Sequence, residues 1–427
     1  MRRNREGETP LTDVAIAARP PRAAAFGFIF ASALLNSISF GIMIPILPNL
    51  IKQMTGGDTA SASEWNVLFS TTWGAMQFIC GPVLGMMSDR FGRRPILILS
   101  IFGLFADFLF MAFAPSLGWL FIGRILNGIT ASSFSTANAY VADITPPEKR
   151  ARNFGILGSA FGFGFMIGPT IGGILGEVSL RLPFIAAAAL CLINALYGLF
   201  VLPESLPPER RTAAVNWRRA NPVGSLIFLK SHGELLGLAT VSFLNQLAQT
   251  VLPAIFVLYA GYRYGWGPGI LGFTFLASGA SMIGVQMFLV GPVVKRFGER
   301  GAVLLGSSLG ALGFLIYAFA YNGWLYAVGI PVFALIGLLQ PGLLGLMSRR
   351  IDPQHQGTLQ GSIQSLQGIA SMVGPSVFGL TFAWLVRNDS KWHLSGGSIL
   401  ISVALLALGF LISLRVARPV ETVAAKG

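Results

Sequence analysis

Apolar stretches of about 20 residues recur about twelve times along the 427 residues of this chain. A stretch of that length, folded as a helix, crosses the hydrocarbon core of a bilayer. Only 11% of the residues are charged, whereas about 25% is usual in soluble proteins. We therefore predict an all-α integral membrane protein with twelve transmembrane helices, near residues 26–49, 66–88, 96–114, 118–141, 154–176, 183–202, 233–260, 268–292, 302–321, 324–347, 358–386 and 396–414.

The basic residues are distributed unevenly between the two sides of the predicted bundle. Of the 30 Lys and Arg residues, 24 fall in the two termini and the even-numbered loops, and 5 in the odd-numbered loops. Basic loops stay on the cytoplasmic side during insertion, so both termini should face the cytoplasm. The net charge of +13 therefore indicates membrane topology rather than nucleic-acid binding. The first 25 residues lack the apolar core of a signal peptide.

The two halves of the chain resemble each other at a constant offset of 206 residues. Motif residues of 85–94 recur at 291–300, and those of 155–173 recur at 361–379. A duplicated six-helix unit is typical of transporters whose halves are related by an axis along the membrane normal. We predict a cytoplasmic tail, a first six-helix bundle, a cytoplasmic linker, a second six-helix bundle and a second cytoplasmic tail, at 1–25, 26–202, 203–232, 233–417 and 418–427.

Three charges of the first half are not repeated in the second. Asp89, Arg124 and Asp143 correspond to Lys295, Ile330 and Arg349. From this difference we infer that energy coupling resides in the first half and that the second half contributes more of the substrate surface.

The segment 155–173 is dense in small residues within an otherwise apolar stretch. In a membrane helix such residues let neighbouring backbones pack closely, and an internal proline bends the helix. The motif consists of Gly155, Gly164, Gly168, Pro169, Gly172 and Gly173. It resembles the antiporter motif in the fifth helix of major facilitator transporters, which implies an exporter.

The loop between the second and third predicted helices also resembles a major facilitator signature. It contains Gly85, Asp89, Arg90, Gly92, Arg93 and Arg94, and the next cytoplasmic loop adds Asp143 and Arg152. Asp89 can accept hydrogen bonds from a helix N-terminus, and Arg93 can bind the carboxylate of Asp143. We expect this cluster to latch the two halves in the outward-open state and to break when they rock. An ordinary positive-inside anchor is the alternative.

Asp107 is the one acidic residue near the middle of a predicted span. A carboxylate there costs about 2.5–3.5 kcal/mol, which favours a functional role. Arg124 lies within the fourth span, where the resemblance implies an arginine associated with proton transfer. We predict that Asp107 carries the proton with the assistance of Arg124. The alternatives are a permanently neutral Asp107, an Asp107 that binds a cationic substrate, and an Arg124 that extends to the outer surface.

Neutral polar side chains recur inside the predicted spans. Amides suit an uncharged or zwitterionic ligand, although many of them bond only to neighbouring helices. The predicted substrate cavity comprises Asn36, Gln77, Asn127, Asn138, Asn245, Gln249, Met282, Gln286, Gln364 and Gln367. We expect no cofactor and no metal site, because the sequence has no phosphate-binding loop and no zinc-like Cys/His spacing.

Nearly the whole chain resembles the tetracycline-resistance exporters, which exchange a metal–tetracycline complex for a proton. The similar segments are 41–50, 87–100, 157–173, 263–273, 302–306 and 356–361. Where those exporters carry ionisable residues in helices one, eight and nine, this chain has Asn36, Met282 and Gly310. The helix-three acid and the helix-two glutamine persist as Asp107 and Gln77.

The resemblance implies a monomeric, multi-pass protein of the bacterial inner membrane that is not an enzyme. It implies proton-coupled export of a tetracycline-like or another hydrophobic compound by alternating access, with the substrate, protons and the lipid bilayer as its partners. The small number of intramembrane charges supports an alternative, a metabolite exporter or facilitator without strict proton coupling. A transporter-like receptor or scaffold is a third reading, which the loop charges and the helix-five motif disfavour.

Overall fold

The computed structural model describes residues 22–130, 133–211, 233–351, 356–389 and 394–417. Within these ranges the chain forms helices and connecting turns, and no β-strand. Residues 1–21 and 418–427 of the predicted tails, and residues 212–232 of the predicted linker, lie outside the described ranges.

The first half contains eight α-helices. They are α1 (Arg22–Met43), α2 (Leu47–Met54), α3 (Thr59–Phe91), α4 (Arg93–Ala112), α5 (Leu117–Thr130), α6 (Ser133–Ile144), α7 (Pro147–Val178) and α8 (Leu182–Phe200). A short 3-10 turn, η1 (Pro208–Arg210), follows them.

The second half contains α10 (Gly233–Gln249), α11 (Val251–Tyr264), α12 (Pro268–Gly284), α13 (Val290–Phe319), α14 (Gly323–Ala334), α15 (Leu339–Ser348), α16 (Gln356–Arg387) and α18 (Gly397–Val416). Two irregular segments interrupt its helices. A π-helix, η3 (Val285–Leu289), joins α12 to α13, and a 3-10 turn, η4 (Leu335–Leu338), joins α14 to α15.

Each of the twelve predicted stretches falls on helices, which confirms the all-α membrane architecture. By length and composition, the described part has ten helical runs that are able to cross a membrane. Two features explain why this number is smaller than twelve. The stretch 118–141 is divided between α5 and α6, and the single run 268–319 contains two predicted stretches.

Two related glycines make the sharp turns at equivalent places in the halves. Gly92 has φ +106° between α3 and α4, and Gly298 has φ +70° within the run 268–319. These angles lie in the left-handed region, which glycine adopts without steric cost. The two positions differ by the repeat offset, so the duplication preserves the turn as well as the helices.

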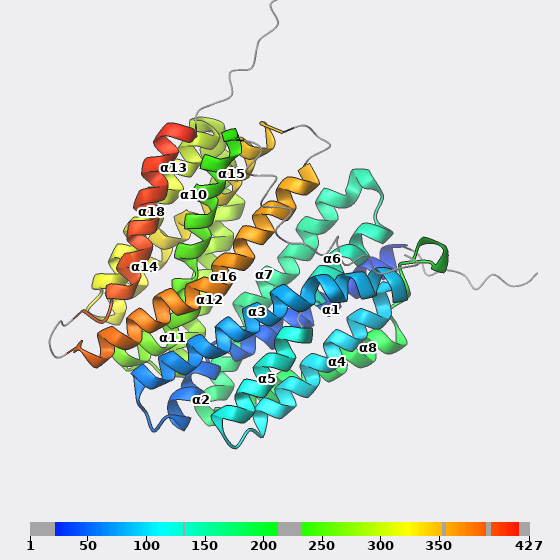
Figure 1. Cartoon of the computed structure of the whole chain (residues 1–427), viewed down its shortest axis with the longest axis horizontal. Coiled ribbons are helices and arrows are strands. Elements are labelled where there is room, and N and C mark those ends of the chain that lie inside the picture. The colour runs from blue at the N-terminus through cyan, green and yellow to red at the C-terminus, as the bar shows by residue number, and fades with distance from the viewer. Residues whose placement is uncertain (1–21, 131–132, 212–232, 352–355, 390–393, 418–427) are drawn as a thin grey trace, which may run out of the picture.

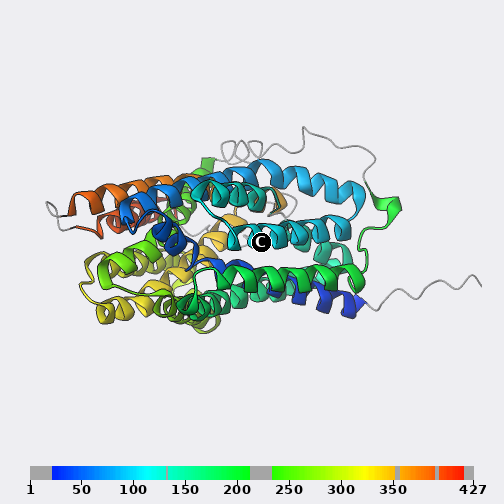
Figure 2. The same cartoon turned by 90° about the horizontal axis from the view of Figure 1, so that it is seen from below.

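The helices form two adjoining bundles, one from each half (Figures 1 and 2). In the first, α7 and α8 pack against α1, and α4 packs against α8. In the second, α18 packs against α10 and α13. Contact between the bundles is made chiefly by α3 with α16 and by α7 with α12.

We call the end that carries the Gly92 turn the linker end, and the opposite end, which carries the turn 55–58, the far end. At the far end, first-half side chains bond to second-half backbone. Ser63 donates to the carbonyl of Gly379 and Asn66 to the carbonyl of Ala254, each at 2.9 Å.

The contact between α7 and α12 adds further hydrogen bonds between the halves, and we call all of these bonds together the far-end closure. Thr170 donates to the carbonyl of Gly272 at 3.2 Å, and a carboxylate oxygen of Glu177 accepts from the N–H of Gly269 at 2.7 Å. Gly269 lies in the first turn of α12, where the helix dipole favours a negative charge. An ion pair between Glu64 and Arg387 also joins the halves.

The halves diverge toward the linker end. A Cβ atom added at Gly81 or Gly85 of α3, or at Gly155 or Gly158 of α7, would meet nothing within 4 Å. Figure 1 shows the upper ends of α10, α13 and α18 well separated from the right-hand ends of α1, α4 and α8. The described helices of the two halves are therefore joined by hydrogen bonds at the far end and diverge at the linker end.

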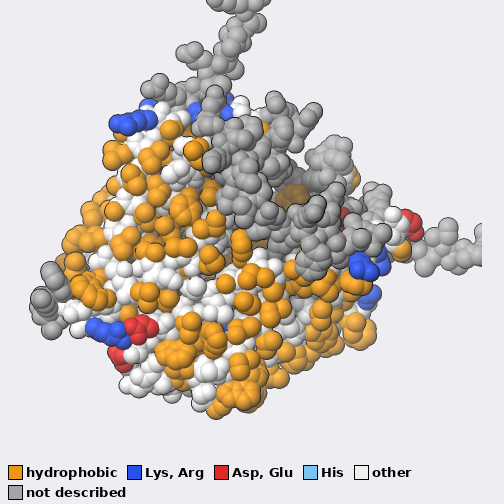
Figure 3. All heavy atoms as spheres, in the orientation of Figure 1, with side chains coloured by type: hydrophobic (Ala, Val, Ile, Leu, Met, Phe, Trp, Pro, Cys, Tyr) orange, Lys and Arg blue, Asp and Glu red, His pale blue; other side chains and the backbone are white. Residues whose placement is uncertain are grey.

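Apolar side chains cover the middle of the face seen in Figure 3, and the coloured charged side chains lie at its edges. Large exposed apolar side chains occur on many helices, including Ile79, Leu99 and Ile193. A surface of this kind suits lipid rather than water.

Candidate functional site

A buried polar network links three helices of the first half. The Nδ2 of Asn127 on α5 donates to Oδ2 of Asp107 on α4 at 2.6 Å. The indole Nε1 of Trp73 on α3 donates to Oδ1 of the same Asn127 at 2.7 Å. Asp107 and Asn127 are both fully buried, with 0% of their surface exposed. The network therefore places a carboxyl group out of reach of solvent.

Small residues bring α4 and α5 close enough for this contact. A Cβ atom at Gly123 would lie 2.9 Å from Oδ1 of Asp107, and one at Gly103 would lie 2.3 Å from the side chain of Thr130. Both distances are too short for any larger residue without a local shift.

The predicted Asp107 and Arg124 are brought to the same region but do not form a direct ion pair in the described part of the chain. Nη1 of Arg124 lies 3.2 Å from Sδ of Met43, and its Cζ lies 5.7 Å from the centroid of the Trp73 ring. Nε of Arg124 and Oδ1 of Asp107 have no hydrogen-bond partner among the described residues. The site thus retains one unused acceptor and one unused donor.

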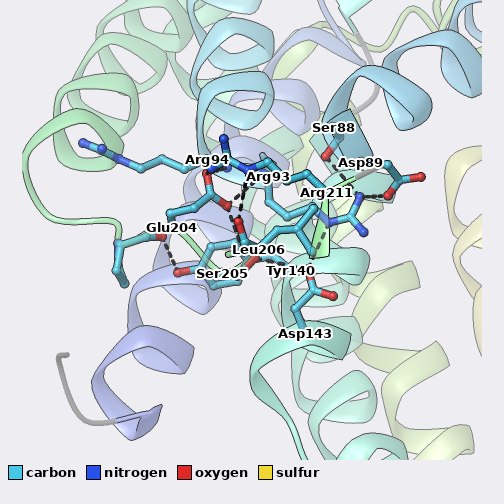
Figure 4. Close-up of polar contacts among 11 residues, drawn as sticks. Ser88, Asp89, Arg93, Arg94, Tyr140, Asp143, Glu204, Ser205, Leu206 and Arg211 are labelled. Atoms are coloured by element: carbon cyan, nitrogen blue, oxygen red, sulfur yellow. Dashed lines mark hydrogen bonds and ion pairs between the residues drawn. The ribbon is translucent and has the colours of Figure 1, made fainter. Parts of the chain in front are cut away.

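The predicted loop cluster assembles around Arg93 (Figure 4). Its Nε donates to Oδ2 of Asp143 at 3.0 Å, and it also forms an ion pair with Asp89. Ser205 donates to the same oxygen of Asp143 at 3.3 Å. The predicted pairing of Arg93 with Asp143 is therefore present, and Arg93 bridges two carboxylates. Arg152 lies in α7, and its side chain is outside the described part.

Sequence reasoning missed Glu204. Its carboxylate accepts from the backbone N–H groups of Arg93 (2.9 Å) and Arg94 (3.3 Å), as Figure 4 shows. It therefore caps the N-terminus of α4, a role that Asp89 was expected to fill at a helix end. Tyr140 donates to the carbonyl of Pro203 at 2.8 Å and helps to hold this segment in place. The available signal was an acidic residue directly after Pro203 in a linker whose other charged residues are mostly basic.

Four of the five glycines of the helix-five motif divide between two partners, whereas a Cβ atom at Gly155 would meet nothing within 4 Å. Cβ atoms at Gly168 and Gly172 would lie 2.7 and 2.1 Å from the carbonyl oxygens of Ile38 and Ile42 on α1. Gly164 likewise faces α1, whereas a Cβ at Gly173 would lie 2.4 Å from the carbonyl oxygen of Pro268 on α12. The motif therefore joins α7 both to its own bundle and to the other half.

Residues 29–375 of the chain match the model of the Major Facilitator Superfamily. The chain belongs to this superfamily. It is 38% identical over 368 residues to the class C tetracycline resistance protein of Escherichia coli, covering 86% of this chain and 90% of that protein. It is 33% identical over 390 residues to the class H protein of Pasteurella multocida, covering 90% and 95%. The chain is a multi-pass membrane transporter rather than an enzyme.

A solved structure supports the fold independently. The human organic anion transporter MFSD10 (TETRAN) aligns with a TM-score of 0.68 at 23% identity, covering 92% of this chain and 100% of that one.

The predicted cavity residues of the transporter do not form one group. Asn36, Asn127 and Asn245 are buried, and Gln249 donates to Oδ1 of Asn245 at 3.1 Å. Of these side chains, Asn127 links neighbouring helices through Trp73 and Asp107, whereas the bond of Gln249 to Asn245 lies within α10. Gln77 is partly exposed, and four others are exposed: Asn138, Gln286, Gln364 and Gln367.

Met282 and Gln286 lie beside the two irregular segments of the second half. Gln286 donates to the carbonyl of Gly337 in η4 at 3.3 Å. Pro341 has no N–H with which to bond to that carbonyl four residues earlier, so the carbonyl is free to accept from Gln286. A Cβ at Gly337 would lie 3.1 Å from Sδ of Met282. Both residues therefore support the break between α14 and α15.

The second half has its own ion pair at the site equivalent to the loop cluster. Glu299 and Arg349 lie 2.7 Å apart, and they correspond at the repeat offset to Arg93 and Asp143. Both charges are inverted relative to the first half, so a pair of opposite charges is retained. The inversion of Asp143 to Arg349 therefore does not by itself indicate that the second half lost this function.

We expect the ion pair of Glu299 and Arg349 to tolerate a swap of its two residues. Glu299→Arg places two cations together, and it should lower the stability of the transporter by about 1 kcal/mol at most, because Arg349 is two-thirds exposed and screened by solvent. The double variant Glu299→Arg/Arg349→Glu should recover at least half of the loss. Unfolding temperature in detergent measures both, with exposed Lys295→Glu as the control. Equal loss in the single and double variants would contradict the prediction.

Proposed function

We propose that this transporter exports a hydrophobic drug, tetracycline-like or of another class, in exchange for protons. The observation that carries the proposal is the buried network of Asp107, Asn127 and Trp73 beside Arg124. Burial of a carboxyl group within a membrane span costs free energy, so such groups are usually functional, and many of them take part in proton transfer. Oδ1 of Asp107, which has no partner in the described part, is the atom that receives the proton.

The proposed orientation places both termini in the cytoplasm of a bacterial inner membrane. It rests on the 24 basic residues that the sequence assigns to the two termini and the even-numbered loops. In this orientation the described helices of the two halves diverge on the cytoplasmic side, where an exporter loads its substrate. Each proton that moves down 100 mV provides about 2.3 kcal/mol, which sustains about fiftyfold accumulation at one-for-one exchange.

The proposed role of the Arg93 cluster is to order the linker end of the first half. Its described contacts all lie within that half. The sequence led us to expect that Arg93 and Asp143 separate when the halves rock away from the outward-open state. In this structure the pair is formed although the halves diverge at the linker end. A contact of Asp89 with the second half remains the proposed closing element.

The class of substrate is proposed from the similar proteins and from three positions of the sequence. Similarity to tetracycline resistance proteins favours a tetracycline-like compound. Asn36, Met282 and Gly310 stand at positions where the family resemblance implies ionisable groups, which favours a less highly charged substrate. Export of a metabolite without proton coupling is the alternative, favoured by the small number of intramembrane charges.

Inverted membrane vesicles with an imposed pH gradient test the proposal. Tetracycline with magnesium, and then a panel of hydrophobic drugs, should release protons from vesicles that contain the transporter and not from empty vesicles. Accumulation of a labelled compound without proton movement would favour uncoupled export. Neither accumulation nor proton movement with any compound would overturn the assignment as a drug exporter.

A further inference from the structure

Trp73 connects the buried acid to the contact between the halves. Its indole is bonded to Asn127, which is in turn bonded to Asp107. Its helix, α3, lies against α16 of the second half: Cβ of a residue at Gly74 would lie 3.7 Å from Cα of Met372. Two residues from Trp73 toward the far end, Thr71 is hydrogen-bonded to Ser376 at 3.2 Å.

The indole also fixes which way the Asn127 amide points. An indole N–H is a donor only, so it requires the amide oxygen of Asn127 to face Trp73. The amide nitrogen must then face Asp107 and donate to Oδ2. A hydrogen bond donated to a carboxylate favours its ionised form. Trp73 thus determines through Asn127 which form of Asp107 the network prefers.

Trp73 is itself held in place on several sides. The guanidinium of Arg124 lies over its ring at 5.7 Å, and the ring of Phe40 lies 5.7 Å away. A Cβ atom at Gly128 would lie 2.9 Å from the carbonyl oxygen of Trp73, so α5 approaches α3 closely here. The charged or titratable groups that act on Asp107 are Arg124 on α5 and Cys191 on α8.

We propose that Trp73 is a positioning residue that holds the Asn127 amide as a donor to Asp107, and so links protonation of Asp107 to the packing of α3 against the second half. This inference rests on the proposed function, in which Asp107 carries the proton. A movement of α3 during rocking shifts the indole, and the amide is then released to rotate and accept from a protonated Asp107.

Trp73→Phe tests this inference because it removes the indole N–H and keeps an aromatic ring under Arg124. The amide of Asn127 can then rotate and accept from the protonated acid. The carboxyl group should hold its proton to higher pH, and the midpoint of its titration should move by about one pH unit to the alkaline side. Trp65→Phe is the matched control, because Trp65 is on the same helix and makes an edge-to-face contact with Phe69 outside the network.

The readout is infrared titration of the protonated-carboxyl band of the purified transporter, assigned to Asp107 by its loss in Asp107→Asn. This measurement needs no known substrate. A midpoint unchanged by Trp73→Phe would overturn the inference while leaving the proposed function intact. Retention of proton-coupled export by Asp107→Asn would instead overturn the proposed function. If Trp73→Phe does not fold, Asn127→Ala removes the same donor and should shift the midpoint in the same direction; no shift would again overturn the inference.

Discussion

Asp107→Asn should abolish proton release driven by substrate. The amide has nearly the same shape and can still accept from Asn127, but it cannot take up or release a proton near neutral pH. Loss of an essential proton-transfer group typically lowers the rate by at least ~100-fold. The measurement is proton release from inverted vesicles after addition of an active substrate.

Two variants make the result for Asp107 specific. Asp107→Glu keeps the titrating group and should retain part of the exchange. Asp389→Asn removes a half-buried acid outside the network that accepts from Tyr262 at 2.8 Å, and it should retain proton-coupled export. Undiminished proton-driven export by Asp107→Asn would show that the proton is carried elsewhere.

Gly172→Ala should severely reduce the amount of folded transporter in the membrane. Its Cβ atom would lie 2.1 Å from the carbonyl oxygen of Ile42, which is backbone and cannot rotate away. Helices α7 and α1 would have to move apart, at a cost of about 1–3 kcal/mol or more. Yield after detergent extraction and the unfolding temperature both measure the effect.

Gly158→Ala is the matched control for this prediction. Gly158 is on the same helix, and a Cβ atom there meets nothing within 4 Å. Both substitutions therefore add a methyl group to α7, but only the methyl group at position 172 meets the backbone of α1. Equal yield and stability of the two variants would contradict the close approach of α7 and α1.

Patterns within single helices predicted much of the fold and part of the site. Apolar length predicted the spans, and the glycine spacing of 164–172 predicted a closely packed helix face, which the approach to α1 displays. The loop signature also predicted the partner of Arg93 correctly. These features are local or follow a known signature, so one sequence is enough to find them.

The features that were missed depend on contacts between distant segments. Trp73 resembles any other apolar residue in a span, and only its position opposite Asn127 makes its N–H important. Glu204 caps a helix that begins 111 residues earlier in the chain. Glu299 and Arg349 stand at the positions that correspond to Arg93 and Asp143 in the repeat. Comparison of one position at a time did not reveal that both charges are inverted, which keeps a pair of opposite charges.

In the far-end closure the first half contributes side chains and the second half contributes backbone groups. In four of its hydrogen bonds a first-half side chain (Ser63, Asn66, Thr170 or Glu177) meets a backbone group of the second half. Backbone carbonyl groups persist whatever side chain is attached, so substitutions in the second half leave the three acceptors in place, and proline at Gly269 is the one replacement that would remove the N–H donor. Sequence drift there is therefore compatible with an intact seal, which gives that half room to evolve toward new substrates.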